Sequence, residues 1–291
     1  MIINQIYGGL GNQMFQYAAG RAASLRLNET MALDISFFES SSLHQGFELF
    51  RVFNIDTPLA GFEEISRVLG WQGFKYMRRI VARPEFKRIR KCSFIIEPSF
   101  NYWPGMRLVP GDCYLSGYWQ SEKYFSDCVS IIRKDFAFKE PLGSLNEELL
   151  KKITQKNSVS LHVRRGDYVA YANTSVYACC SIGYYKKAVD YIAAQVKDPV
   201  FFVFSDDPDW VKANLKFEYD HFYVSHNKGT ESYNDMRLMS RCDHHIIANS
   251  SFSWWGAWLN PCIDKIVIAP EAWFVNGTDA SDLCPEAWIK L

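Results

Sequence analysis

The architecture of the chain follows from nine residues, Val159-Ser160-Leu161-His162-Val163-Arg164-Arg165-Gly166-Asp167. Three of the first five are apolar, and β-branched Val159 and Val163 frame the segment, which predicts a β-strand in a parallel sheet covered by helices. Three charged residues, Arg164, Arg165 and Asp167, follow this strand directly. Because open α/β sheets bind their ligands beyond the carboxyl ends of the strands, we expect residues 164–167 to face a ligand crevice.

The rest of the chain extends this pattern to an α/β fold of two domains, 1–142 and 143–291. From residue 145 onward, helical and strand patterns alternate, as expected for strands joined by covering helices. We predict helices at 145–156, 182–196, 208–215, 232–241 and 252–259, and strands at 159–163, 200–204, 221–224, 245–248 and 265–269. The N-terminus predicts strands at 2–7 and 30–35, a glycine turn at 8–11 and a helix at 12–27. Prolines interrupt residues 37–139, which predict no clear order of elements.

Composition and charge exclude several classes of protein. The chain has 291 residues, 48% of them hydrophobic and 22% charged, which is too apolar for a disordered chain. Its 32 basic residues balance 32 acidic ones, so no net field attracts a nucleic acid. The sequence shows no signal-peptide pattern, no apolar run of membrane-spanning length and no Cys-x-x-Cys pair among its eight cysteines. We therefore expect a cytoplasmic protein with reduced thiols.

Arginines follow the strand at 159–163. An arginine fork matches two phosphate oxygens, and each charge-assisted hydrogen bond contributes about 1.5–3 kcal/mol. Arg164 and Arg165 could therefore hold a diphosphate and stabilise it as a leaving group without a metal. The alternative is a structural ion pair between one of these arginines and Asp167.

Acidic residues follow the strand at 200–204. Pro208 suits the first position of a helix and Asp207 the N-cap before it, so we expect one acid to cap the next helix. The other acid, Asp206 or Asp207, would be free to accept hydrogen bonds from the adjacent N–H groups on a guanine edge. Asp207-x-Asp209 resembles a metal-binding motif, but a helix that starts at Pro208 turns Asp209 away, so we expect no metal site.

A hydroxyl-rich segment follows the strand at 245–248. It comprises Asn249, Ser250, Ser251, Phe252 and Ser253. Backbone N–H groups and hydroxyls at such a helix start can bind phosphate. The alternative is a serine N-cap followed by a buried Trp254–Trp255 pair, and the serines can serve both purposes.

The glycine turn near the N-terminus is a fourth candidate site. Gly9 and Gly11 let a backbone approach a ligand closely, and Asn12 and Gln13 offer donors and acceptors at a helix start. The turn matches neither the dinucleotide-binding nor the P-loop motif. An ordinary tight turn between strand and helix explains the glycines equally well.

Together, residues 8–14, 162–167 and 249–255 resemble glycosyltransferase family 11, the α-1,2-fucosyltransferases. The resemblance implies a GT-B fold, in which two Rossmann-like domains face each other across a cleft, with GDP-β-L-fucose as donor and no metal or cofactor. It implies inverting transfer to the 2-hydroxyl of a terminal β-galactoside, on a glycan of O-antigen or milk-oligosaccharide type. The alternatives are a transferase of another sugar and a non-catalytic protein that binds nucleotide sugars or glycans.

The resemblance also assigns roles to residues of this sequence. Arg164 would bind the diphosphate and assist its departure, and Asn12 would reach across the cleft. The glycine turn at 8–13 lacks the carboxylate of some relatives, so Asp167 is the candidate general base; the alternative is that Asp167 braces the arginines and catalysis rests on Arg164. The donor contacts would come from His162, Arg165, one of Asp206 and Asp207, Asn249, Ser250, Ser251, Phe252, Ser253, Gly9, Gly11 and Gln13. Because sugar rings stack on aromatic faces, the aromatic-rich first domain is expected to shape the acceptor groove, and the sequence leaves open which of Tyr102, Trp103, Tyr118 and Trp119 line it.

A basic, aromatic segment lies in the first domain. Residues 71–91 contain eight basic residues and one acid, Glu85, interleaved with Trp71, Phe74 and Tyr76. This mixture is typical of a surface that rests on anionic lipid, here the cytoplasmic face of a membrane carrying a lipid-linked glycan. The alternative is a solvated basic helix face.

Overall fold

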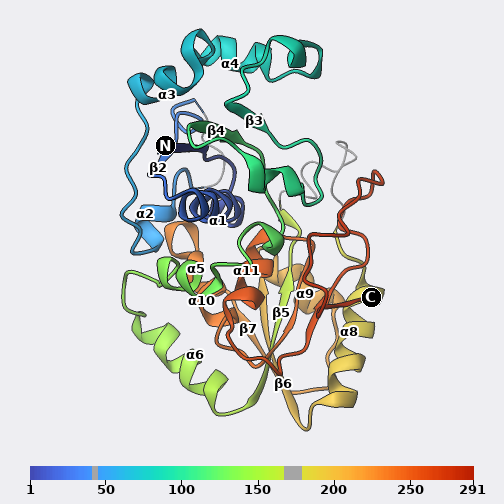
Figure 1. Ribbon diagram of the computed structural model, residues 1–291. Coiled ribbons are helices and arrows are strands. Elements are labelled where there is room, and N and C mark those ends of the chain that lie inside the picture. Colours follow the sequence, from blue (N-terminus) through green and yellow to red (C-terminus); the bar gives the residue numbers. More distant parts are fainter. Residues whose placement is uncertain (41–44, 167–178) are drawn as a thin grey trace. The chain divides into compact units, whose positions relative to one another are not determined.

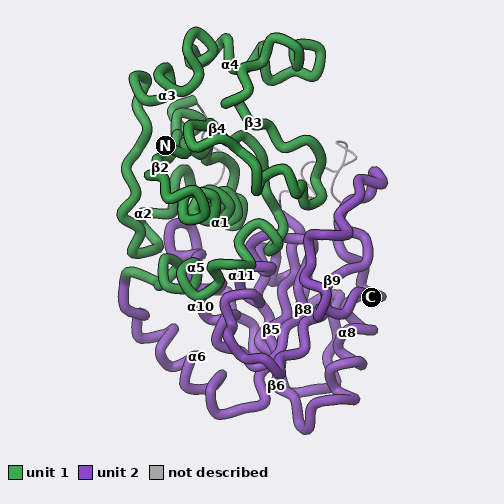
Figure 2. The backbone as a smooth tube through the Cα atoms, in the orientation of Figure 1, with its two compact units in different colours: residues 1–139 green, residues 140–291 purple. Residues whose placement is uncertain are grey.

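The computed structural model of the protein describes residues 1–40, 45–166 and 179–291 (Figure 1). The chain divides into two compact units, Met1–Lys139 and Glu140–Leu291 (Figure 2). Each unit is built on a sheet, and the strand pairs described in both sheets run parallel. The α/β class with parallel sheets predicted from the sequence is confirmed.

Unit 1 begins with the predicted strand–helix–strand opening. Its strands are β1 (Ile2–Gln5), β2 (Met31–Asp34), β3 (Phe94–Ile96) and β4 (Cys113–Ser116), in the sheet order β2-β1-β4-β3. Its α-helices are α1 (Leu10–Leu27), α2 (Leu49–Val52), α3 (Phe62–Leu69), α4 (Lys75–Val81) and α5 (Val129–Asp135). Short 3₁₀ helices lie at η1 (Gly70–Gly73), η2 (Pro84–Ile89), η3 (Pro104–Leu108) and η4 (Glu122–Tyr124).

Helices cover both faces of the unit 1 sheet (Figure 1). Ile3 of β1 lies in one apolar cluster with Ile65 of α3 and Val81 of α4. Asn4 points to the opposite face, because side chains alternate along a strand, and there it donates a hydrogen bond to the backbone oxygen of Gln16 in α1. The sheet of unit 1 is therefore a middle layer between α1 and the α3–α4 segment.

Unit 2 contains a six-stranded sheet. Its strands are β5 (Asn157–Val163), β6 (Pro199–Ser205), β7 (His221–Val224), β8 (His244–Ile246), β9 (Val267–Ala269) and β10 (Ile289–Lys290), in the order β10-β9-β8-β5-β6-β7. Its helices are α6 (Ser144–Thr154), α8 (Ile182–Gln195), α9 (Pro208–Asn214), α10 (Tyr233–Met239) and α11 (Ser251–Leu259), with a 3₁₀ turn η6 (Gly229–Glu231).

The central strands of unit 2 are buried on both faces, as the sequence predicted, whereas β7 and β10 at the edges of the sheet are partly exposed. Phe201 of β6 packs in a cluster with Ile192 of α8, whereas its neighbour Phe202 packs with Ile153 of α6 and Leu238 of α10. Successive residues of one strand thus fill two separate cores. This double burial fixes the register of the sheet and the positions of the residues that follow its strands.

Several smaller expectations can be compared with the structure. Trp254 and Trp255 are fully buried, as predicted, and all eight cysteines are free. The helices and strands predicted for unit 2 are present, but β10 has only two residues and was not predicted. In unit 1, β3 and β4 were not predicted either. No helix in the described parts of the chain is long and apolar enough to cross a membrane.

Candidate functional site

Three neighbouring strands of unit 2 end at the same edge of its sheet. β5 lies between β8 and β6, and all three run parallel, so the residues that follow them gather at one edge. Arg164 follows β5, Asp206 follows β6, and Asn249 lies shortly after β8. We call the segments 162–166, 205–209 and 247–253 the carboxyl edge of unit 2.

Arg164 forms an ion pair between two strand ends. Its Nη1 lies 3.0 Å from Oδ2 of Asp206, and its side chain is 27% exposed. The same carboxylate accepts hydrogen bonds from the backbone N–H groups of Arg165, at 2.9 Å, and Gly166, at 3.0 Å. Asp206 therefore fixes the loop after β5 and holds the Arg164 guanidinium at the edge. Asp167, the other predicted partner, lies outside the described residues, so its pairing and its role as a base stay predictions.

Arg165 is held by the start of α9. Its Nε lies 3.3 Å from Oδ2 of Asp207, and its guanidinium stands 3.7 Å from the centre of the Trp210 ring. A guanidinium that both stacks on an indole and pairs with a carboxylate has little freedom to turn toward a ligand. Arg165 is thus a supporting cation, and Arg164 is the more available one.

The prediction that one of the two acids stays free is wrong. Oδ1 of Asp207 accepts a hydrogen bond from the backbone N–H of Trp210 at 3.2 Å, which is the predicted N-cap of α9. Asp206 is engaged by Arg164 and two backbone N–H groups, because ionised carboxylates attract the donors of the neighbouring strand end. Asp209 points away, as predicted, with 96% of its side chain exposed.

His162 lies near the end of β5 and is 5% exposed. Burial, together with the charge of Arg164, lowers the pKa of His162 to about 3, so its imidazole is neutral. Its Nδ1 is buried and has no hydrogen-bond partner among the described residues. His162 can therefore give or accept a hydrogen bond but adds no positive charge to the edge.

The segment after β8 enters α11 without a side-chain cap. Ser250 occupies the N-cap position, as the serine N-cap alternative expected, but its hydroxyl makes no capping hydrogen bond. Asn249 is buried, and its Nδ2 donates to the backbone oxygen of Trp273 at 3.1 Å. Ser253 is fully buried and donates to the backbone oxygen of Ser250 at 3.3 Å, which argues against its predicted phosphate contact. Residues 251–252 remain candidates because they are half-buried at the helix start.

The glycine turn of unit 1 serves mainly to hold the fold. Gly8 has a φ of 78°, a left-handed conformation that favours glycine, and Gly9 precedes the first residue of α1. The Nε2 of Gln13 donates to the backbone oxygens of Gly8 at 2.9 Å and Gly46 at 2.8 Å. Its Oε1 accepts a third backbone hydrogen bond at 2.9 Å. Gln13 and Gly11 are buried, which argues against their predicted donor contacts.

A second group of polar side chains lies at the carboxyl edge of the unit 1 sheet. Oδ1 of Asn12, in the first turn of α1, accepts a hydrogen bond from Nε2 of Gln120 at 2.7 Å. Glu97, directly after β3, accepts hydrogen bonds from the backbone N–H groups of Tyr118, at 2.6 Å, and Trp119, at 2.9 Å. These segments follow β1, β3 and β4, whose parallel pairing brings their ends together.

Glu97 is a titratable carboxyl group at this edge. Burial raises its pKa to about 7, although the two backbone hydrogen bonds act in the opposite direction. The rings of Tyr7 and Tyr118 lie 5.0 Å apart, edge to face, and burial together with the charge of Glu97 raises the pKa of both hydroxyls. Tyr118 is 37% exposed, so solvent reaches this edge. A carboxyl group with a pKa near 7 can take a proton from a bound hydroxyl at physiological pH.

The sequence patterns did not reveal Glu97. The available signal was an acid directly after the short apolar run 94–96, the same pattern that drew attention to Asp206.

Of the aromatic residues considered for the acceptor groove, Tyr118 lies at this edge. Trp119 is fully buried with a φ of 55°, which removes it from the four candidates for the groove.

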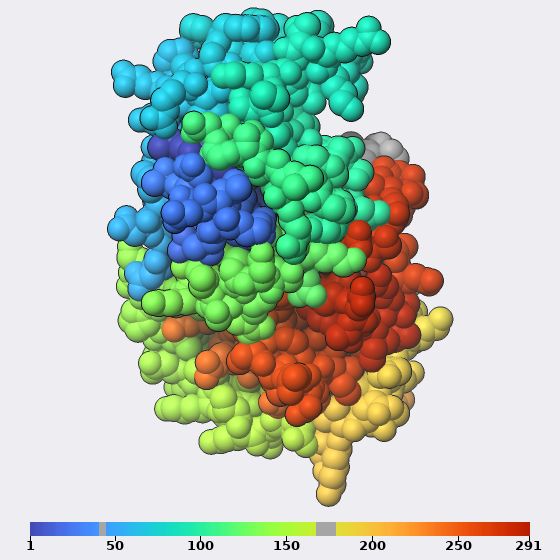
Figure 3. Space-filling model, in the orientation of Figure 1, coloured from blue at the N-terminus to red at the C-terminus, as the bar shows by residue number. Residues whose placement is uncertain are grey.

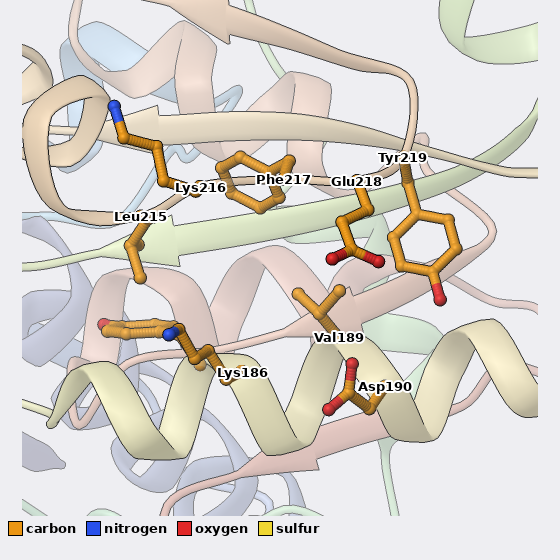
Figure 4. A pocket seen from close by; sticks show the side chains of 9 residues that line it. Lys186, Val189, Asp190, Leu215, Lys216, Phe217, Glu218 and Tyr219 are labelled. Carbon is orange, nitrogen blue, oxygen red and sulfur yellow. The ribbon is translucent and has the colours of Figure 1, made fainter.

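A separate cavity of about 300 Å³ lies in unit 2, between α8 and the segment 215–219 (Figure 4). Charged side chains of both signs line it, with Lys186 and Asp190 on α8 and Lys216 and Glu218 opposite. The segment 215–219 leads into the amino end of β7, so the cavity does not contain the strand ends described above. We exclude it from the candidate site.

Comparison with known proteins identifies the family to which the chain belongs. The sequence pattern of glycosyl transferase family 11 matches residues 106–290. The α-1,2-colitosyltransferase of Escherichia coli is 35% identical, over 100% of this chain and 99% of that protein. The O-antigen biosynthesis glycosyltransferase WbnK of Escherichia coli is 34% identical, over 98% of both. The fucosyltransferase NodZ of Bradyrhizobium shares the fold, with 15% identity over 89% of this chain and 92% of its own and a TM-score of 0.55. The protein is therefore a glycosyltransferase and belongs to glycosyltransferase family 11.

Proposed function

We propose that this protein transfers L-fucose from GDP-β-L-fucose to the 2-hydroxyl of a terminal β-galactoside, with inversion and without a metal. The α-1,2 linkage is supported by the name of the colitosyl relative, and the donor by the α-1,6-fucosyltransferase NodZ, crystals of which were soaked with GDP-fucose. The observation that carries the donor site is Arg164 at the carboxyl edge of unit 2. The proposal includes a GT-B arrangement, in which the carboxyl edges of both units face the substrates, and a cytoplasmic acceptor glycan of O-antigen type. The relative WbnK is named for O-antigen biosynthesis, which supports this class of acceptor.

Arg164 would take the charge that develops on GDP as its bond to fucose breaks. A guanidinium carries five N–H donors, so Arg164 can keep its contact with Asp206 and present further donors to the diphosphate. Asp206 holds the guanidinium and the loop N–H groups in place beforehand, so little reorganisation is needed during the reaction. Arg165 adds charge from its fixed position, and the start of α11 offers backbone N–H groups.

Glu97 is our candidate for the general base. Once ionised, its carboxylate would accept the proton of the attacking 2-hydroxyl. Tyr118 and Tyr7, at the same edge, offer aromatic surface on which the apolar face of a galactose ring can pack. The hydrogen bond from Gln120 orients Asn12 beside them.

A colitosyl nucleotide is the second candidate donor, because the relative with 35% identity over the full chain is a colitosyltransferase. Colitose is L-fucose without its 3-hydroxyl, so the two sugars differ at one polar group. A site built to hydrogen-bond that hydroxyl strongly rejects a sugar without it, because its own polar groups would stay unpaired. The diphosphate contacts do not discriminate between these donors.

A turnover assay with linkage analysis tests the proposal. We expect GDP release from GDP-fucose that depends on lactose, an α-1,2-linked product, undiminished activity in EDTA, and a higher kcat/KM for GDP-fucose than for the colitosyl donor. Donor binding without turnover on any glycan of an acceptor panel would favour a non-catalytic binding protein. A preference for the colitosyl donor would reassign the sugar, and loss of activity in EDTA with rescue by Mn²⁺ would contradict metal-free transfer.

A further inference from the structure

Unit 1 concentrates exposed apolar side chains on one helical layer. Among the described residues, sixteen large apolar side chains are exposed, and seven of them lie between residues 62 and 89. They are Phe62, Trp71, Phe74, Tyr76, Ile80, Phe86 and Ile89. Isolated exposed apolar residues are ordinary, but such a concentration marks an interaction surface. We call residues 62–91 the basic-aromatic layer; Figure 3 shows part of its surface in blue-green.

The inner side chains of the layer pack against the rest of unit 1. Ile65, Val68 and Val81 pack against the sheet. Nη1 of Arg78 lies 2.5 Å from Oδ2 of Asp34 at the end of β2, and both side chains are buried. These contacts anchor the layer, so its outer residues cannot turn inward to cover themselves.

The outer side of the layer mixes apolar and cationic residues. On α4, Tyr76 is 79% exposed, and Arg79 and Ile80 follow it at spacings of three and four residues, which places all three on one helix face. In η2, Phe86 and Ile89 are three residues apart and share one side, since 3₁₀ helices repeat every three residues. Apolar side chains thus alternate with cations over the outer surface.

The cations of the layer divide into two groups. Four of the eight basic residues at 71–91 bond to groups of unit 1: Lys75, Arg78, Arg90 and Lys91. The other four, Arg79, Arg83, Lys87 and Arg88, are exposed, and their side chains pair with none of the residues that the structure describes. Glu85 is the one acid in residues 71–91, and the rest of the layer adds Arg67, Glu63 and Glu64, so the layer as a whole carries nine basic residues against three acids.

An anionic lipid surface fits both features of the layer. Aromatic side chains insert at the headgroup level of a bilayer, and lysine and arginine are attracted to anionic headgroups. A second copy of the layer would bring cations against cations, which is unfavourable. A nucleic acid would satisfy the cations but leave Trp71 and Phe74, each more than half exposed, uncovered.

We propose that residues 62–91 dock unit 1 on an anionic phospholipid bilayer as a peripheral contact. Because the whole chain has no net charge, the attraction depends on a local cationic surface, and this layer supplies one that would orient the molecule. The cationic part of the binding weakens as salt is added, since the screening length falls from about 10 Å at 0.1 M to about 3 Å at 1 M. The part of the binding that comes from the aromatic side chains should not weaken as salt is added.

Vesicle sedimentation of the full chain tests this docking. We expect the protein to sediment with vesicles that contain phosphatidylglycerol and to bind phosphatidylcholine vesicles at least about tenfold more weakly. The combined variant Arg79→Gln, Arg83→Gln, Lys87→Gln and Arg88→Gln should lose more than about tenfold in partition coefficient. The variant Trp71→Ser with Phe86→Ser should lose the binding that remains at high salt.

A matched control removes four exposed lysines of unit 2: Lys151→Gln, Lys186→Gln, Lys187→Gln and Lys197→Gln. It should bind anionic vesicles as the parent does, and all variants should melt at the temperature of the parent. Equal losses in the control and the layer variants would overturn the proposal. So would heparin binding without vesicle binding, or a self-association that the layer variants abolish, since these point to a nucleic acid or a second copy.

Discussion

Replacing Arg164 by alanine should lower kcat/KM for fucosyl transfer by about 10- to 150-fold. This range corresponds to the loss of one charge-assisted hydrogen bond, about 1.5–3 kcal/mol, to a leaving group that gains charge in the transition state. The loss should appear in kcat as well as in kcat/KM, because the contact strengthens as the bond to fucose breaks. Steady-state assays of GDP release measure both constants.

Two further variants distinguish this role from a structural one. Arg164→Lys keeps the charge but loses the planar fork, so it should fall between the parent and the alanine variant. Arg241→Ala removes an exposed arginine elsewhere in unit 2 and should leave the rate unchanged. The pair of Arg164 with Asp206 is partly exposed, so its loss should cost little stability. A rate loss below about tenfold for Arg164→Ala would contradict the leaving-group role.

Replacing Glu97 by glutamine should lower kcat by about 100- to 10,000-fold, the usual contribution of a general base. In the parent, kcat/KM should fall about tenfold for each pH unit below about 7, because the carboxyl group must be ionised to accept a proton. This acidic limb should be absent from the residual activity of the variant. Initial rates across a pH series measure it, and Glu63→Gln, at an exposed position on α3, is the matched control.

Stability supplies an independent readout for Glu97. Its folded-state pKa of about 7 lies above the ordinary glutamate value of 4.5, so the folded protein binds this proton more tightly than the unfolded chain does. The stabilising contribution is full below about pH 4.5 and is lost as the pH rises through 7. Urea unfolding should show this loss in the parent and not in Glu97→Gln. A variant with normal turnover and an unchanged acidic limb would show that Glu97 only fastens the Tyr118–Trp119 loop.

The positions of the charged residues in unit 2 could be predicted, but their partners could not. An apolar run that ends in charge, as at Val163 and Arg164, indicates a buried strand and its exit. The partner of Arg164 is Asp206, which lies on another strand and becomes a neighbour only through the register of β5 with β6. Strand order is a property of the whole sheet, and local patterns do not carry it.

The environment of Glu97 is harder to predict from sequence patterns than that of Arg164. β3 has only three residues, too few for a clear alternation. The carboxyl group is buried by a loop that returns about twenty residues later, where Trp119 adopts a left-handed backbone conformation that bulky residues rarely take. Its raised pKa therefore depends on a tertiary contact that the local sequence does not encode.

The central claim is that Arg164 holds the diphosphate of the donor, and calorimetric titration with GDP and GMP tests it most directly. The two nucleotides share guanine, ribose and the α-phosphate, so they differ in the β-phosphate that would meet the guanidinium. We predict that Arg164→Ala weakens GDP binding by more than about tenfold and GMP binding much less, which removes most of the preference for GDP. Equal weakening of both nucleotides, or an unchanged affinity for GDP, would contradict the account.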